Sequence, residues 1–114
     1  MLILPIKRQW FNMIKEGKKK EEYREIKPYY TTRFKNILGE EKMQQINKGE
    51  KIFLGPVIFR NGYSKNSPTF VANCSISINT GNTKWGAEYG VKYYVLTVDS
   101  IKEENKWKNI QPVE

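Results

Sequence analysis

The chain has 114 residues and a mass of 13.5 kDa, the size of one ordinary domain, and we expect a single domain over residues 1–114. It has no histidine and one cysteine, Cys74, which excludes a disulfide framework, a Cys/His zinc site and a histidine-based catalytic triad. The formal net charge of +8 favours polyanionic partners such as nucleic acid or an anionic membrane surface, although many small proteins are basic without binding RNA.

We expect neither a signal peptide nor a membrane span in this sequence. The apolar run in MLILPIKRQW is too short for a signal peptide, and no segment approaches the roughly 20 apolar residues that a transmembrane helix needs. A lone thiol outside any disulfide framework is typical of a reducing compartment. We therefore expect a cytoplasmic protein with no membrane partner, no metal and no cofactor.

The first predicted elements are a strand and a helix. Residues 2–6 predict a short strand in which Pro5 marks an edge or an end, because proline cannot donate to a central ladder. Apolar residues then recur at helical spacing over residues 7–16, and Gly17 suits the C-cap of that helix. Residues 18–25 are so densely charged that periodicity allows either a helix or a strand.

The rest of the chain predicts a helical region followed by strands. A second helical stretch is expected over residues 29–46, with an interruption at Gly39. Apolar residues alternate strictly over residues 70–78, which predicts a half-buried strand, and residues 91–101 predict a final strand rich in Tyr, Val and Leu. The tail over residues 102–114 is mostly polar and has no predicted element.

Residues 52–59 predict one further strand, broken at Gly55-Pro56 and followed by the turn-like Arg60-Asn61-Gly62. The order is thus strand, helix, charged segment, helix and three strands. This order suits a small α+β fold or a partly open barrel with helices at its ends.

A short motif follows the predicted strand and helix. Gly17, Lys19, Glu22 and Arg24 have the spacing Gly-x-Lys-x-x-Glu-x-Arg. This motif resembles the signature of ASCH domains, which are small RNA-associated relatives of PUA domains. Two later segments also resemble bacterial and phage ASCH-like proteins, so that the likeness covers most of the chain: Lys27-Pro28-Tyr29-Tyr30 and Phe59-Arg60-Asn61-Gly62-Tyr63.

The resemblance implies a fold and a ligand. The implied fold is an α+β, PUA-like small mixed β-barrel of about five strands, with two or more helices at its ends. Its basic cleft would bind RNA or a modified nucleotide. The candidate ligand-binding residues are Lys7, Lys19, Glu22, Arg24, Arg60, Asn61 and Tyr63.

The charged segment can be interpreted in two ways without the resemblance. If it is a strand, a period of two puts Glu22 and Arg24 on one face. An arginine held by a carboxylate is oriented to offer its remaining donors to a phosphate or a base edge, and Lys19 adds a mobile charge. The alternative is a solvated charge run whose surface pairs contribute little energy.

Several other residues also have two interpretations. Arg60 and Asn61 can be hydrogen-bond donors in the same cleft, with Tyr63 as a stacking face, or the segment can be only a hairpin turn. Trp85 can cover a base or anchor its loop to the core. Cys74 alternates with apolar residues, so we interpret it as a small buried hydrophobe.

The resemblance also carries an enzymatic alternative. One ASCH branch hydrolyses acetylated cytidine with a Lys and a Thr of the signature and a Glu that precedes the last strand. Lys19 matches that lysine and Glu88 lies in the segment of the carboxylate, but Glu22 occupies the threonine position. The catalytic candidates are therefore Lys19, Glu22 and Glu88, for hydrolysis of a modified nucleoside or cleavage of RNA.

A third function class is an interaction module without a ligand, which would present a large exposed apolar patch. If the binding hypothesis is correct, ligand-binding residues from distant segments should share one concave surface. These residues are Lys19, Glu22, Arg24, Arg60 and Tyr63.

Overall fold

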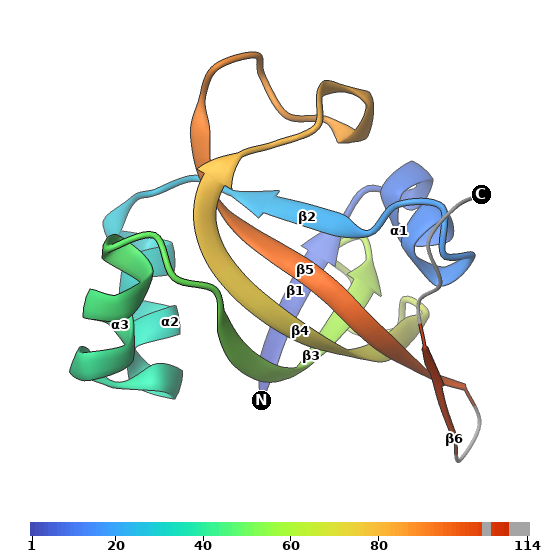
Figure 1. The fold of residues 1–114 in the computed structure, drawn as a ribbon. Coiled ribbons are helices and arrows are strands. Elements are labelled where there is room, and N and C mark those ends of the chain that lie inside the picture. The colour runs from blue at the N-terminus through green and yellow to red at the C-terminus, as the bar shows by residue number, and fades with distance from the viewer. Residues whose placement is uncertain (104–105, 110–114) are drawn as a thin grey trace. The chain divides into compact units, whose positions relative to one another are not determined.

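The computed structural model describes residues 1–103 and 106–109 (Figure 1). The strands are β1 (Leu2–Ile6), β2 (Glu21–Arg24), β3 (Ile52–Asn61), β4 (Thr69–Thr80), β5 (Lys92–Glu103) and β6 (Lys106–Asn109). The helices are α1 (Arg8–Lys15), α2 (Pro28–Leu38), α3 (Glu40–Asn47) and the short 3₁₀ helix η1 (Thr83–Trp85).

The strands form one mixed sheet. Its order is β1-β3-β4-β5-β2, and β6 pairs with β5. The β1–β3 pair is parallel, whereas β2 and β6 each run antiparallel to β5. The mixed sheet and the three α-helices confirm the predicted α+β class. The sheet has about the predicted number of strands, as in a small barrel-like fold.

The residues group into two compact units. The first unit comprises Met1–Lys20, Gly55–Cys74 and Val98–Glu114, and the second comprises Glu21–Leu54 and Ser75–Thr97. Strands β3, β4 and β5 each contribute residues to both units. The expectation of one domain over residues 1–114 stays a prediction.

Aromatic side chains form the centre of the first unit. Phe11 of α1 lies against Phe70 of β4, with ring centroids 4.9 Å apart, and Phe59 of β3 lies 5.4 Å from the same ring. All three are buried, and burial of each such side chain contributes about 1.5–3 kcal/mol. Phe11 is thus a core residue of this unit, whereas Trp10 on the same helix is only half-buried.

Gly17 ends α1 as the sequence predicts. Its φ of +79° is easy only for glycine, and it lets the Gly17 N–H donate to Ile14 O at 3.0 Å and the Lys18 N–H donate to Met13 O at 2.8 Å. These two bonds form a Schellman motif, which satisfies carbonyl groups at the helix end. Within the charged segment over residues 18–25, Glu21–Arg24 form β2, so the strand interpretation holds for these four residues.

The predicted break at Gly55-Pro56 is wrong, because β3 is continuous through both residues. Gly55 has a φ of +107°, and the buried positions change phase there, from Leu54 to Val57. Such a change is typical of a β-bulge, in which one extra residue is absorbed without ending the strand. The apparent breaker is therefore a local distortion within a strand.

The Asn61-Gly62 pair also differs from the tight two-residue hairpin that it resembles. Strand β3 extends through Asn61, and the chain returns to β4 through a longer loop over residues 62–68. The Asn61 N–H donates to Pro68 O at 3.0 Å and closes this loop. Gly62 adopts a φ of +91° directly after the strand.

Helices α2 and α3 lie against each other in the second unit (Figure 1). Pro28 occupies the first turn of α2, where its missing N–H costs nothing, and Gly39, with a φ of +86°, separates the two helices as predicted. Phe34 of α2 is buried edge-on to Tyr94 of β5, with centroids 5.0 Å apart. The Thr31 and Tyr94 hydroxyls share a 2.6 Å hydrogen bond beside this contact.

The tail contains an element that the sequence did not predict. Strand β6 pairs with the end of β5 in a register that joins Ser100 to Asn109 and Glu103 to Lys106.

None of the helices in the described part of the chain is long and apolar enough to span a membrane.

Candidate functional site

Strand register in the first unit places the backbone of several predicted ligand residues at one end of a strand pair. In the parallel β1–β3 pair, Pro5 is the partner of Arg60 and Ile6 is the partner of Asn61. The Gly62 N–H continues the pairing by donating to Ile6 O at 2.9 Å. Lys7 follows Ile6 and Tyr63 follows Gly62, so both residues leave the same end of the strand pair. We call Lys7, Arg60, Asn61 and Tyr63 the strand-end cluster.

The side chains of this cluster differ in exposure. Tyr63 is 88% exposed and Lys7 is also exposed, whereas Arg60 and Asn61 are half-buried. The Nε atom of Arg60 is buried and has no hydrogen-bond partner among the described residues. Because the residue is half-buried, the exposed part of its guanidinium remains the part that a bound molecule could reach.

The sequence around the cluster is strongly basic. Glu16 is the only acidic residue in Met1–Lys20 and Gly55–Cys74, and it pairs with Lys18 at 3.0 Å. The basic residues of the same two segments are Lys7, Arg8, Lys15, Lys18, Lys19, Lys20, Arg60 and Lys65. A concentration of one charge sign in these two segments attracts polyanions to them.

Lys19 is buried in the first unit. Its side chain is 1% exposed, and its ammonium nitrogen lies 4.5 Å from the centroid of the Trp10 ring. Desolvation strengthens such a cation–π contact. Lys19 is therefore not the mobile surface charge that the sequence suggested. Its contact with Trp10 was not predicted from the sequence.

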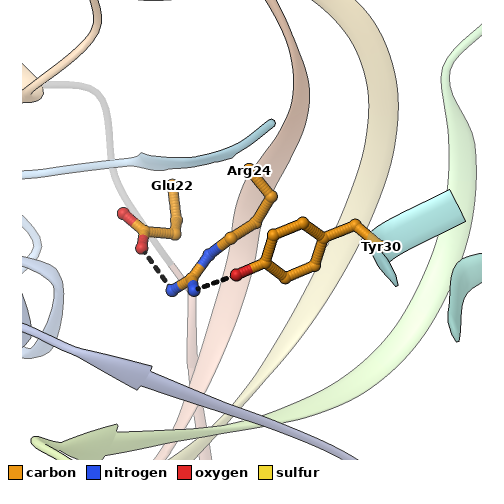
Figure 2. Close-up of polar contacts among 3 residues, drawn as sticks. All are labelled: Glu22, Arg24 and Tyr30. Atoms are coloured by element: carbon orange, nitrogen blue, oxygen red, sulfur yellow. Dashed lines mark hydrogen bonds and ion pairs between the residues drawn. The ribbon is translucent and has the colours of Figure 1, made fainter. Parts of the chain in front are cut away.

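The second unit holds the Glu22–Arg24 pair (Figure 2). Arg24 Nη2 lies 2.7 Å from Glu22 Oε2, and the two side chains are 12% and 9% exposed, respectively. The residues are neighbours on one face of β2, as the period of two predicts. Because both side chains are largely buried, the interpretation as a solvated surface pair does not hold for them.

Tyr30 completes this network and was not predicted. Arg24 Nη1 donates to the Tyr30 hydroxyl at 3.2 Å, as Figure 2 shows, and the guanidinium carbon lies 5.7 Å from the ring centroid. Lys27 Nζ lies 5.5 Å from the same centroid. The Lys27-Pro28-Tyr29-Tyr30 segment indicated this region only through its resemblance to other proteins.

The third catalytic candidate, Glu88, lies in an exposed loop of the second unit. Its backbone N–H donates to the Tyr93 hydroxyl at 3.1 Å. Its carboxylate makes no hydrogen bond or ion pair within the part of the chain that the structure describes. Trp85 in the same loop is half-buried, so both of its interpretations stay open.

Tyr23 fixes the start of that loop. Its hydroxyl accepts a 2.8 Å hydrogen bond from the Asn82 N–H and donates a 2.7 Å bond to Glu21 Oε1. Burial is the main cause that raises the pKa of Tyr23 above its usual value, and the nearby carboxylates act in the same direction.

Cys74 is fully buried in the first unit, and burial, assisted by the charge of Asp99, raises the pKa of its thiol to about 12. The thiolate is the reactive form of cysteine, so this residue is unsuited to nucleophilic catalysis. Its interpretation as a small buried hydrophobe agrees with this position.

The predicted site residues therefore fall into two groups. The strand-end cluster and Lys19 belong to the first unit, whereas Glu22, Arg24 and Glu88 belong to the second. Their convergence on one concave surface stays a prediction.

Within residues 1–103 and 106–109, no three His, Cys, Asp or Glu side chains are grouped so that they could hold a metal ion. No protein-family model, curated protein or solved structure matches this chain.

Proposed function

We propose that the chain binds RNA or a nucleotide through the strand-end cluster. The observation that carries the proposal is the β1–β3 register, which places Lys7 and Tyr63 at the same end of two paired strands. This set of side chains has the chemistry that a nucleotide requires. Lys7 and Arg60 supply positive charge for phosphate, the Asn61 amide can bond to a base or sugar edge, and Tyr63 offers a ring for stacking.

The half-buried guanidinium of Arg60 favours an anionic ligand in particular. A phosphate oxygen that accepts from its exposed N–H groups would at the same time neutralise its charge. Hydrogen bonds between charged groups are about twice as strong as those between neutral groups. Both charge attraction and hydrogen bonding would therefore favour contact between Arg60 and the ligand.

The basic sequence around the cluster and the resemblance to ASCH domains favour the same ligand class. Long-range attraction from this charge would raise the rate at which a polyanion meets the unit. The charged residues of the motif that resembles the ASCH signature are Lys19, Glu22 and Arg24. These three residues stay candidate ligand contacts, although burial leaves little of their surface for a ligand.

The proposal is tested by the matched variants Tyr63→Ala and Tyr89→Ala. Both tyrosines are almost fully exposed, at 88% and 93%, but Tyr89 belongs to a loop of the second unit. Loss of one base-stacking ring costs about 1–3 kcal/mol, or roughly 5- to 100-fold in affinity. We expect this loss for Tyr63→Ala and no comparable change for Tyr89→Ala when fluorescence anisotropy measures the binding of labelled single-stranded RNA.

Because neither tyrosine is buried, both variants should keep the unfolding midpoint of the wild-type protein. Equal binding by all three proteins would exclude the strand-end cluster as the site. Absence of RNA or nucleotide binding by the wild-type protein would reject the function itself.

A hydrolase acting on a modified nucleoside is the second candidate function, and the burial of Lys19 favours it. A lysine shielded from solvent beside Trp10 has the surroundings in which amines take part in proton transfer. Incubation with acetylcytidine tests this function, and Lys19→Arg keeps the charge while it displaces the amine. Turnover by the wild-type protein that is lost in Lys19→Arg would identify a hydrolase, whereas no turnover by the wild-type protein would reject this candidate.

A further inference from the structure

We infer that α2 carries a second contact for nucleic acid, in which Tyr29 and Arg33 stack on an unpaired base. This inference rests on the proposed binding function. It adds a site in the second unit and specifies the ligand as single-stranded. We call Tyr29 and Arg33 the stacking pair.

The stacking pair lies on the exposed side of α2. Tyr29 is 54% exposed, and the guanidinium carbon of Arg33 lies 3.6 Å from the centroid of its ring, which is van der Waals distance. Arg33 Nη1 also donates to Tyr29 O at 3.3 Å, which restrains the guanidinium. Nucleobases stack on tyrosine rings and on guanidinium planes, and both surfaces are present here in contact with each other.

The pair is supported from beneath by the buried network. Tyr30 meets Tyr29 edge-on, with centroids 5.0 Å apart and planes at 88°. Tyr30 is itself held by the Arg24 guanidinium, which is fixed by Glu22 (Figure 2). A surface that is ordered before the ligand arrives loses less conformational entropy on binding. The motif residues Glu22 and Arg24 thus act here as positioning residues for an exposed aromatic side chain.

The charge on α2 favours an anionic occupant. Its sequence, PYYTTRFKNIL, contains no acidic residue. Lys27 and Lys35 have carboxylate partners in Glu25, at 3.8 Å, and Glu40, at 3.1 Å. Arg33 has no carboxylate partner within the described ranges, so its charge remains available to a ligand.

A single-stranded nucleic acid matches both the shape and the charge of this surface. In a duplex the faces of each base are covered by its neighbours, whereas a single strand can present a base to a flat aromatic surface and its phosphate to a nearby cation. Aromatic stacking accepts any base, so we expect little sequence preference.

The inference is tested with Tyr29→Leu, which keeps apolar bulk without a ring, and Arg33→Lys, which keeps the charge without a plane. Lys42→Gln, an exposed position on α3, serves as the control for loss of charge. The probes are fluorescein-labelled oligouridylate, an abasic strand of the same length, and a blunt RNA duplex. We expect the first two variants to bind oligouridylate roughly 5- to 100-fold more weakly and to bind the abasic strand as the wild-type protein does.

Two further measurements distinguish stacking from charge. The salt dependence of oligouridylate binding should be the same for Arg33→Lys and the wild-type protein, because the number of charges is unchanged. Unfolding midpoints should also be unchanged, because both side chains are largely on the surface. Equal losses on the abasic strand or the duplex would overturn the inference, since they would indicate a phosphate contact.

Failure of this inference can be separated from failure of the proposed function. If Tyr63→Ala weakens oligouridylate binding while Tyr29→Leu and Arg33→Lys do not, only the stacking pair is rejected. If the wild-type protein binds none of the probes, the binding function and the stacking pair are rejected together.

Discussion

At the scale of single residues, the Glu22–Arg24 pair is a largely buried ion pair in the second unit. Its 2.7 Å contact joins two largely buried side chains, and removal of one partner leaves a charge in a poorly solvated position. We therefore expect Arg24→Ala to lower the free energy of unfolding by about 2–4 kcal/mol. Urea denaturation monitored by circular dichroism would measure the change.

The exposed Lys18–Glu16 pair is the control for this prediction. Its side chains are 69% and 54% exposed, and such pairs contribute little because water and salt screen them. Lys18→Ala should change the free energy of unfolding by no more than about 0.5 kcal/mol. Similar losses from Arg24→Ala and Lys18→Ala would show that burial does not strengthen the Glu22–Arg24 contact.

The Cys74 thiol makes the stability of the protein depend on pH in the alkaline range. An unfolded thiol ionises near its ordinary pKa of 9.0, whereas the folded thiol has a pKa of about 12. Above pH 9 the unfolded state therefore releases a proton that the folded state keeps, so the free energy of unfolding falls by up to about 1.4 kcal/mol per pH unit until pH 12.

Cys74→Ala removes this dependence and tests it. The free energy of unfolding, measured in urea at pH 9.0 and pH 10.5, should fall less in the variant than in the wild-type protein. Tyr23 acts in the same direction in both proteins, so the comparison isolates the thiol. Identical slopes would mean that Cys74 ionises as easily in the folded protein as in the unfolded chain.

At the scale of structural elements, the loop after β4 depends on one close approach. A Cβ atom at Gly81 would lie 2.6 Å from the Ala87 Cβ and 2.7 Å from a ring carbon of Tyr23. Ala87 is buried and the Tyr23 ring is held by its hydroxyl, so neither neighbour can move freely. Gly81→Ala should lower the free energy of unfolding by about 1–3 kcal/mol, as overpacking does elsewhere.

Gly62→Ala separates this steric effect from the general loss of a glycine. A Cβ there meets nothing within 4 Å, but φ is +91°, so the expected cost is the backbone strain of about 1–2 kcal/mol. The two variants should differ in where they act. Gly81→Ala should increase amide hydrogen exchange at Asn82, whose N–H bonds to Tyr23, whereas Gly62→Ala should leave that amide protected.

The elements that could be predicted from the sequence are those that depend on interactions between residues close together in the chain. Gly17 and Gly39 end helices because each adopts a positive φ, and the alternation over residues 70–78 shows one buried face of β4. The ambiguity of residues 18–25 was of a different kind. That segment becomes strand β2 through pairing with Thr97 and Leu96 of β5, which are distant in the sequence.

Elements and site residues that depend on distant partners were missed. Gly55-Pro56 has the composition of a break, but β3, which lies between β1 and β4 in the sheet, continues through it. The role of Tyr30 depends on a contact with Arg24 on another element, and nothing in a helical pattern identifies such a contact. The Glu22–Arg24 contact, in contrast, was predictable because period-two spacing places the two side chains next to each other.

At the scale of the whole molecule, the net charge of +8 decides how any nucleic acid would be bound. Each phosphate that a lysine or arginine neutralises releases counterions, so affinity falls as salt rises. With about three to five phosphates engaged, the slope of log affinity against log salt for single-stranded RNA should be about −2 to −4. Anisotropy titrations of labelled oligouridylate at several salt concentrations would measure this slope.

Charge-matched variants distinguish a defined site from diffuse attraction. Lys7 belongs to the strand-end cluster, whereas Lys48 is an equally exposed lysine that caps α3 in the second unit. If the cluster binds phosphate, Lys7→Gln should reduce the steepness of the slope by about 0.7, the contribution of one phosphate contact on a single strand. Lys48→Gln should leave the slope unchanged, because loss of a remote charge removes no counterion-releasing contact. Equal reductions would mean that the RNA samples the whole basic surface, and the strand-end cluster would then be no more than one part of it.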